Sequence, residues 1–203
     1  CRYYPAQGGP FPGVIILGGS EGGLFEGWAR AFASNGFAAL TLAHFAYADL
    51  PEELVEIPLE YFGRATAWMK AQPRVKAGRL ALVGGSKGGE LALLLASRSS
   101  DYRAVVAMTP AAHVWEGHTM RFFSPDYQSV SSWSYGGRPL PYMPFKASPE
   151  DKEREKNGEL ESFVPENVAT TDFDQAYRIT NLAALWLPAA FEPRNINSPD
   201  AVV

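Results

Sequence analysis

The sequence has little of several features that define large classes of protein. Its 203 residues include one cysteine, Cys1, which excludes an internal disulfide and a metal site built from cysteines. The formal net charge is −4, and nucleic-acid binding requires a clustered basic surface instead. No apolar run approaches the ~20 residues of a membrane span, and no signal-like segment opens the sequence. We therefore expect a cytoplasmic globular protein that has no membrane span and does not bind nucleic acid, and we assign no cofactor to it.

What the sequence does contain is enough apolar material for one domain. Hydrophobic residues make up 46% of the chain, which suffices to bury a sizeable core. Because the chain begins at cysteine and not at methionine, we also expect that residues precede it in the natural protein.

Short apolar runs alternate with helical patterns in the first half of the chain, which is typical of parallel strands joined by helices. Strands are predicted over residues 13–17, 37–42, 79–83 and 103–108. Phe25, Trp28, Ala29 and Phe32 recur at helical spacing and predict one helix, which Asn35-Gly36 closes. A second helix has Pro58 in its first turn. A third helix, over residues 88–97, is nearly all apolar and is expected to be buried.

Beyond Pro110 the regular pattern ends. Residues 110–147 hold many aromatic side chains without a sustained period, which predicts an irregular excursion over the carboxyl end of the sheet. These aromatic residues either shape a pocket for an apolar substrate or pin a long loop to the core. We expect residues 1–147 to form the core with this excursion, and residues 148–203 to form a charged link and an irregular tail of the same domain.

The most informative motif is Gly84-Gly85-Ser86-Lys87-Gly88, which lies between an apolar strand and an apolar helix. It fits the G-x-S-x-G nucleophile elbow, where a serine on a tight strand-to-helix turn projects its hydroxyl above the sheet. The glycines are needed because the turn is strained and brings a strand and a helix into close contact. The alternative is an ordinary turn whose serine caps the helix through its side-chain oxygen.

A serine nucleophile needs amides that stabilise a developing oxyanion. One is expected from the residue after the serine, Lys87, and the other from the loop after an earlier strand. The run Gly18-Gly19-Ser20-Glu21-Gly22-Gly23 stands in that position, so we assign the second amide to the Ser20 region. A phosphate-binding loop is less favoured, because the Lys-Ser/Thr ending of a Walker motif is absent.

The base that would activate the serine is not evident. In this architecture an acid and then a histidine follow the serine along the chain. The three histidines are His44, His113 and His118, and none lies in the region that should supply the base. We therefore expect Ser86 to be a weak nucleophile at neutral pH.

Several stretches together give a more specific resemblance. They are residues 13–23, Leu50-Pro51 with residues 57–62, residues 86–93, Ser132-Trp133-Ser134-Tyr135 and Pro139-Leu140-Pro141-Tyr142. In this order they resemble the carboxyl-terminal catalytic domain of the acyl-CoA thioesterase and bile acid-CoA:amino acid N-acyltransferase family, over roughly residues 10–145. The resemblance implies an α/β-hydrolase-like fold, with a mainly parallel sheet and helices on both faces.

The resemblance also implies a reaction. Ser86 would attack an acyl-CoA thioester, and amides of Lys87 and the Ser20 region would bind the oxyanion. Family members that conjugate bile acids use cysteine at the nucleophile position, so serine favours hydrolysis to a free fatty acid and coenzyme A. A carboxylesterase or dienelactone-hydrolase-like enzyme is an alternative, and a non-catalytic remnant that binds an acyl chain or a partner is another.

Two departures from the family pattern affect these expectations. The family's amino-terminal β-sandwich domain is missing here. Its later strands, with an Asp-Asp segment and a histidine near the end, have no counterpart after Phe145. We therefore expect a catalytically incomplete chain in which the strand over residues 103–108 has an open apolar edge.

Overall fold

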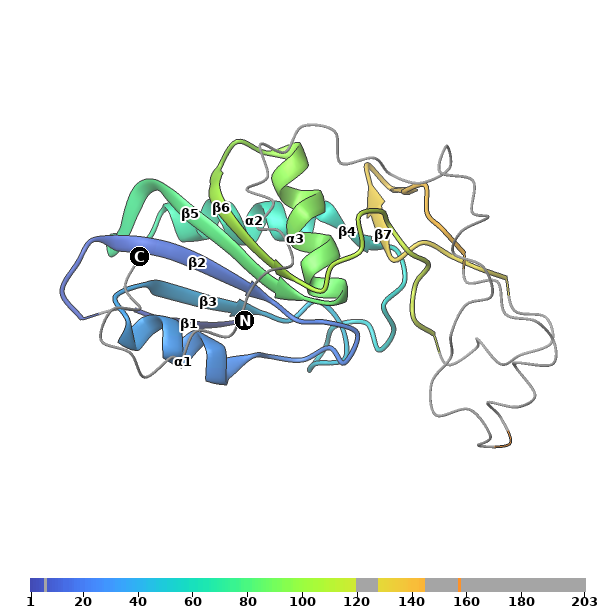
Figure 1. The fold of residues 1–203 in the computed structure, drawn as a ribbon, viewed down its shortest axis with the longest axis horizontal. Helices are drawn as coiled ribbons and strands as arrows, with labels where there is room; N and C mark the ends of the chain where they lie inside the picture. The colour runs from blue at the N-terminus through green and yellow to red at the C-terminus, as the bar shows by residue number, and fades with distance from the viewer. Residues whose placement is uncertain (6, 120–127, 145–156, 158–203) are drawn as a thin grey trace.

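A five-stranded, mainly parallel sheet forms the centre of the computed structural model (Figure 1). The structure describes residues 1–5, 7–119, 128–144 and 157. The strands lie in the order β1-β3-β2-β5-β6 and span Arg2–Tyr4 (β1), Phe11–Leu17 (β2), Ala38–Leu42 (β3), Val75–Gly85 (β5) and Tyr102–Met108 (β6). Strand β1 runs antiparallel to β3, and the other neighbours pair in parallel.

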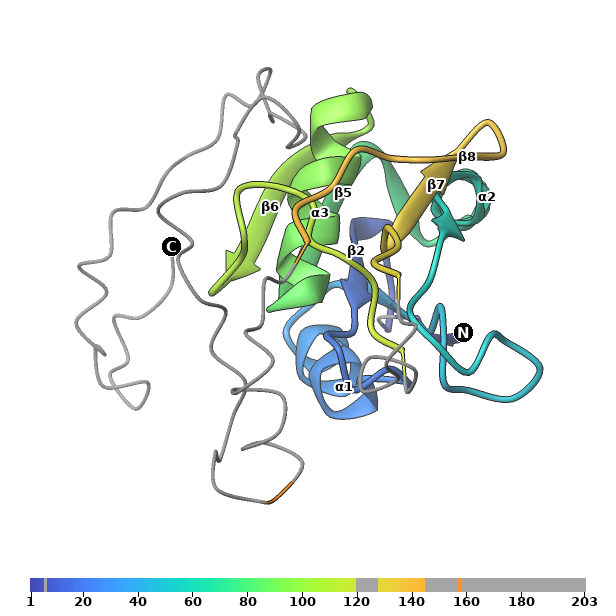
Figure 2. The ribbon, with the colours of Figure 1, turned by 90° about the vertical axis from the view of Figure 1, so that its right-hand side faces the viewer.

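Helices cover both faces of this sheet, as predicted. Figures 1 and 2 show α1 (Glu26–Ser34) on one face, and α2 (Leu59–Lys70) and α3 (Lys87–Arg98) on the other. The α1 face buries Val14, Ile16 and Val83, whereas Ile15 and Leu17 belong to the larger core under α2 and α3. A strand buried on both faces reads as a continuous apolar run, which is why β2 was evident in the sequence.

The predicted strands and helices are all present, with corrected ends. Strand β1 was not predicted, because three residues are too short for a periodic signal. Pro58 lies one position before α2 in an extended conformation, and not in the first helical turn as predicted. It belongs instead to β4 (Ile57–Pro58), which pairs with β7. Gly36, at φ +82°, follows α1 where the predicted αL closure falls.

The described part of residues 110–147 is mostly irregular, with a small second sheet. Strands β4, β7 (Trp133–Tyr135) and β8 (Arg138–Pro139) form it. The Trp133 side chain is fully buried in the larger core, and Tyr142 packs against that core. These contacts support the interpretation that aromatic residues pin the excursion to the sheet. The predicted link and tail, residues 148–203, lie outside the described residues except for residue 157.

Strand β6 is the last strand of the sheet within the described residues, and its outer face is poorly covered. Val106 is 49% exposed and Met108 is 37% exposed. By contrast, Val83 lies opposite Val106 on β5 and is 3% exposed under α1. Among the described helices, none has the length and apolar character needed to cross a bilayer.

Val83 and Val106, which lie opposite each other on β5 and β6, provide a matched test of how the two strands are covered. Val83→Ala should lower the free energy of unfolding by about 2 kcal/mol, because it removes buried methyl groups from a packed core. The same substitution at Val106 should change it by no more than about 0.5 kcal/mol. Urea denaturation of both variants measures the difference, and equal losses would contradict the assignment of the two faces.

Candidate active site

Ser86 occupies a sharp turn between β5 and α3, as predicted. Strand β5 ends at Gly85, α3 begins at Lys87, and Ser86 has φ 51° and ψ −121°. Its N–H donates to the Met108 carbonyl at 2.9 Å, and its own carbonyl accepts the Glu90 N–H at 3.0 Å. Ser86 is exposed and makes no side-chain capping hydrogen bond to α3, so the helix-capping alternative is wrong. A positive φ at a non-glycine residue is strained, and surrounding contacts must hold it.

Two glycines allow the backbone segments at this turn to come close together. A Cβ atom added at Gly84 would lie 2.1 Å from the Gly88 carbonyl oxygen. A Cβ atom at Gly88 would lie 2.5 Å from the carbonyl oxygens of both Leu17 and Gly18. The first turn of α3 therefore packs directly against the end of β2, and no side chain fits between them.

The glycine-rich loop after β2 lies beside the Ser86 turn. A Cβ atom at Gly19 would be 3.3 Å from the Gly85 carbonyl oxygen, and the Gly23 N–H donates to the Phe45 carbonyl at 3.3 Å. Ser20 is half-buried in this loop. The two segments that sequence analysis assigned to an oxyanion site are thus neighbours. That the amides of Ser20 and Lys87 bind an oxyanion remains a prediction.

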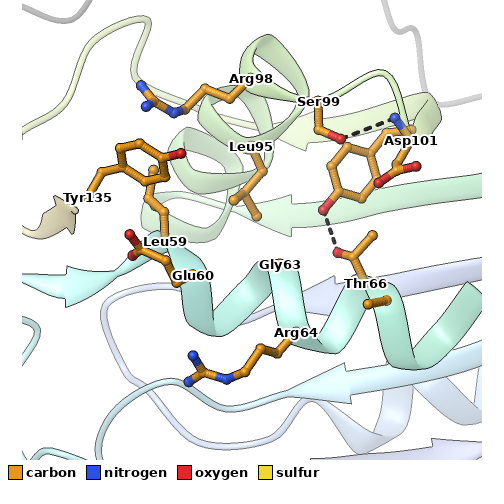
Figure 3. A pocket seen from close by; sticks show the side chains of 12 residues that line it. Leu59, Glu60, Gly63, Arg64, Thr66, Leu95, Arg98, Ser99, Asp101 and Tyr135 are labelled. Carbon is orange, nitrogen blue, oxygen red and sulfur yellow. Dashed lines mark hydrogen bonds between the residues drawn. The ribbon is translucent and has the colours of Figure 1, made fainter.

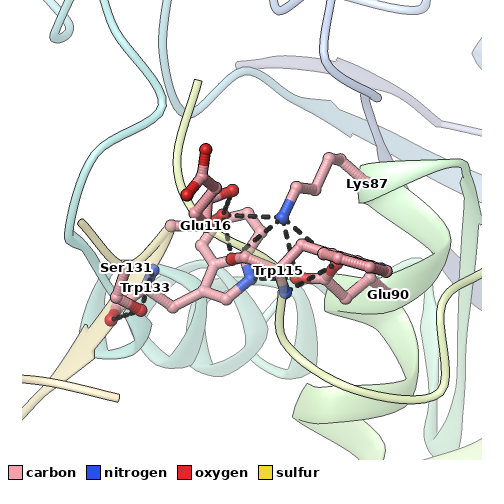
Figure 4. Close-up of polar contacts among 7 residues, drawn as sticks. Lys87, Glu90, Trp115, Glu116, Ser131 and Trp133 are labelled. Atoms are coloured by element: carbon pink, nitrogen blue, oxygen red, sulfur yellow. Dashed lines mark hydrogen bonds and ion pairs between the residues drawn. The ribbon is translucent and has the colours of Figure 1, made fainter. Parts of the chain in front are cut away.

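The Lys87 side chain turns inward, which was not predicted. It is 6% exposed, and its Nζ donates to the Ser132 Oγ at 2.7 Å and to the Trp115 carbonyl at 3.2 Å. It also reaches both carboxylate oxygens of Glu90, at 3.2 and 3.1 Å (Figure 4). Burial lowers the pKa of Lys87, and the charge of Glu90 opposes that shift.

Glu90 forms the other half of this buried cluster. Its Oε1 accepts the Trp133 Nε1–H at 2.8 Å, and its Oε2 accepts the Trp115 N–H at 3.4 Å. Burial raises the pKa of Glu90, and the Lys87 ammonium opposes that shift. The carboxylate thus has polar partners on both oxygens, as a buried charge requires.

The cluster joins motifs that are far apart in the sequence. Ser86 to Leu93 and Ser132 to Tyr135 were singled out separately, and the contacts of Lys87 and Glu90 bring them together. The roles of Glu90, Ser132 and Trp133 were not predicted from the sequence. The available signal was a lysine and a glutamate three residues apart at the start of an otherwise apolar helix.

His44 is enclosed in the core on the α2 side of the sheet. It is 2% exposed, and its ring contacts those of Phe45, Phe62 and Trp133 at centroid distances of 5.2 to 5.5 Å. Neither ring nitrogen makes a hydrogen bond of normal geometry. Burial lowers the pKa of His44 to about 4, which the nearby Leu42 backbone opposes only in part. This enclosure agrees with the expectation that His44 is not a base for the exposed Ser86.

The other two histidines lie nearer to Lys87. The His113 ring contacts the Trp115 ring at a tilt of 55°, with ring centroids 4.6 Å apart. Burial lowers the pKa of both His113 and His118, and the positive charge of Lys87 lowers each further. Both rings are therefore biased toward the neutral form.

A groove of about 720 Å³ lies between α2 and α3 (Figure 3). Leu59 and Leu95 contribute apolar surface, and Arg98 lies 4.3 Å above the ring of Tyr135, which also lines the groove. Arg98 ends α3, whereas Ser86 precedes it, and a helix of 12 residues is about 18 Å long. An aromatic residue of the excursion thus lines a groove, but at the end of α3 away from the serine.

The close backbone contacts at Gly88 predict that an added methyl group destabilises the protein, and Gly63 provides the control position. Gly88→Ala should lower the free energy of unfolding by about 1–3 kcal/mol, because the new methyl group meets two backbone carbonyls. Gly63→Ala, in α2 with nothing near its Cβ, should raise it by about 0.5–1 kcal/mol. Thermal or urea unfolding measures both effects. Stabilisation by Gly88→Ala would show that the turn is looser than described.

The buried His44 predicts a pH effect on stability. The folded protein keeps His44 neutral down to a pKa of about 4, whereas the unfolded chain binds a proton at its ordinary pKa of 6.5. Lowering the pH from 7.5 to 5 therefore protonates the unfolded state first, and His44 reduces stability by about 2 kcal/mol over this range. His44→Phe should remove that part of the loss. Parallel pH profiles for the parent and the variant, from urea denaturation, would contradict the prediction.

Comparison with known proteins matches the resemblance seen in the motifs. Residues 57–137 match the family described as BAAT / Acyl-CoA thioester hydrolase C terminal. The chain is 50% identical over 104 residues to acyl-coenzyme A thioesterase 6 of Homo sapiens, covering 51% of this chain and 25% of that protein. It is 42% identical over 109 residues to acyl-coenzyme A amino acid N-acyltransferase 1 of Mus musculus, covering 54% of this chain and 26% of that protein.

The chain spans about a quarter of the length of these curated relatives. Among solved structures it is similar to the α/β hydrolase GrgF from Penicillium sp. sh18, with 23% identity and a TM-score of 0.47 over 53% of this chain and 40% of that one. The family match over residues 57–137 and the curated relatives confirm the predicted resemblance to the BAAT / acyl-CoA thioester hydrolase C-terminal family.

Proposed function

We propose that this chain carries the nucleophile of an acyl-CoA thioester hydrolase. The Ser86 Oγ attacks the thioester carbonyl and loses its proton, the carbon–sulfur bond breaks, and coenzyme A leaves as the protonated thiol. Water then hydrolyses the acyl-serine ester, which releases the free acid and restores the hydroxyl. The observation that carries this proposal is the exposed Ser86 on a strained turn between β5 and α3.

The surroundings of Ser86 support nucleophilic attack at this position. The first amides of a helix have no partner within the helix, and they carry the positive end of the helix dipole. Lys87 and Gly88 provide such amides directly after the serine. A negative charge that develops on a substrate oxygen would be stabilised there, in the space next to the loop of residues 18–23.

The substrate class is proposed from the relatives. One is named a thioesterase for acyl-coenzyme A and the other an acyltransferase that uses acyl-coenzyme A. Both names share the acyl-CoA thioester and differ in what accepts the acyl group. We favour water as the acceptor, because a serine ester is readily hydrolysed.

The base that takes the proton from Ser86 is not identified among the residues that the structure describes. His44 is enclosed in the core. His113 and His118 follow Ser86 too soon to fit the order of serine, acid and then histidine along the chain that a triad of this fold requires. Loss of triad partners slows catalysis by several orders of magnitude, although binding and an oxyanion site leave a residual rate. We therefore expect slow turnover by this chain, limited by proton removal from Ser86.

Added imidazole tests this assignment. Release of free thiol from a long-chain acyl-CoA should be slow and should rise when imidazole is added, because the buffer then supplies the missing base. Ser86→Ala should lack both the slow turnover and the imidazole-dependent increase beyond the rate without protein. Ser97→Ala, at the far end of α3, serves as the matched serine control and should behave like the parent.

The same assay separates the alternatives. Turnover of a p-nitrophenyl ester but not of acyl-CoA would favour a carboxylesterase. Formation of N-acylglycine when glycine is present would favour an acyltransferase. Acyl-CoA binding without any Ser86-dependent product would favour a binding role. Rapid turnover that His113→Ala abolishes would show that His113 is the base.

A further inference from the structure

We propose that the Lys87 side chain, held by Glu90 and Ser132, is the positioning group that fixes the Ser86 turn in its reactive geometry. Lys87 thus acts twice, through its backbone amide on the substrate oxygen and through its ammonium group on the turn itself. The assignment rests on the proposed function, since it concerns the reactivity of the same serine. It extends the site to Glu90 of α3 and to Ser132, which directly precedes β7, and the motif includes neither residue.

The position of the Lys87 charge calls for an explanation. A cation at the amino terminus of a helix opposes the helix dipole, and a lysine side chain at such a position ordinarily extends into water. Here the ammonium is buried, with its nitrogen 3.1 Å from a Glu90 oxygen that is itself buried. Burial of this pair brings little net stability, because desolvation offsets much of the attraction. We therefore assign to the Lys87–Glu90 pair the role of fixing the geometry of the Ser86 turn. Two apolar side chains in its place would not make the directional contacts that fix this geometry.

The ammonium group joins three segments of the chain. Lys87 belongs to the first turn of α3, Trp115 lies on the segment after β6, and Ser132 directly precedes β7. Its three N–H groups are shared among four acceptors, namely both Glu90 oxygens, the Trp115 carbonyl and the Ser132 Oγ. The Ser132 hydroxyl in turn lies 2.9 Å from the carbonyls of Trp115 and Glu116.

These contacts act on the residues that hold Ser86 in its strained conformation. The Ser86 N–H is bonded to Met108 at the end of β6, and the Ser86 carbonyl is bonded to the N–H of Glu90. Lys87 follows Ser86 directly and ties Glu90 to the segment that continues from β6 (Figure 4). One of the two Ser86 backbone hydrogen bonds is thus made by a member of the buried cluster, and the other is made by β6, whose continuing segment the cluster holds at Trp115. A positive φ at serine persists only where neighbours determine it in this way.

The test uses a charge-neutral double variant, Lys87→Met with Glu90→Gln. It removes both buried charges together and keeps the approximate shape of the side chains, and the amide oxygen of the new glutamine can still accept from Trp133. The matched control is Lys70→Met, which removes the exposed ion pair between Lys70 and Asp101 at the carboxyl end of α2. Hydrogen exchange of the peptide over residues 84–91 and the rate of Ser86 labelling by a fluorophosphonate are measured for each. In that labelling the serine oxygen bonds to phosphorus, fluoride leaves, and the proton goes to water.

We expect the double variant to exchange the amides of Ser86 and residue 90 at least 10-fold faster, with exchange in α1 unchanged. Its labelling rate per folded molecule should fall at least 10-fold, whereas its affinity for a thioether analogue of acyl-CoA should change less than 3-fold. Lys70→Met should match the parent in all three measurements. If the double variant does not fold, Ser132→Ala, which removes one acceptor of the ammonium, is used in its place. It should also speed amide exchange at the turn and slow Ser86 labelling, by smaller factors.

Two results would overturn the assignment. One is exchange at residues 84–91 within 2-fold of the parent. The other is faster exchange throughout the sheet with an unchanged labelling rate per folded molecule, which is the signature of a merely stabilising pair. Failure of the proposed function would look different, because a parent that does not turn over acyl-CoA still reports on the turn through hydrogen exchange.

Discussion

The structure depends on the close approach of the first turn of α3 to the end of β2. Gly88 lies against the carbonyls of Leu17 and Gly18, where a single methyl group would come within 2.5 Å of both oxygens. This contact sets α3 at the carboxyl end of the sheet and places Ser86 on a turn whose positive φ is strained for a non-glycine residue. It also brings the loop of residues 18–23 beside the serine. The candidate site is thus a consequence of how tightly one helix meets two strands.

A second constraint, the buried ion pair at the start of α3, acts on the same turn. The buried ion pair of Lys87 and Glu90 connects α3 to the irregular excursion through Ser132, Trp115 and Trp133. The excursion is therefore fastened to the Ser86 turn by polar contacts and to the core by an aromatic side chain. Residues 57–137, which match the family, include β4 and β7, and these pair with each other in the small second sheet. Polar contacts and strand pairing together hold the irregular segment that the hydrophobic pattern alone did not explain.

The two faces of the sheet are covered by helices to different extents. The face under α2 and α3 carries the larger core, which also encloses His44, whereas α1 covers only part of the other face. On that second face Val83 is buried and its registered partner Val106 is exposed. The contrast follows from the position of α1, which packs over β3, β1 and β2 and leaves the outer side of β6 uncovered in the described residues.

The sequence by itself determined the alternation of strands and helices, the turn at Ser86 and the resemblance to the family. Continuous apolar runs and the glycines around one serine are local signals, because backbone sterics and burial act on adjacent residues. The sequence did not reveal β1, the extended conformation of Pro58, or the inward direction of the Lys87 side chain. Only the tertiary structure decided these, because each depends on a partner that is distant in the chain. A lysine points into a protein only where Glu90, Ser132 and a backbone carbonyl already surround its charge, and that arrangement exists only after folding.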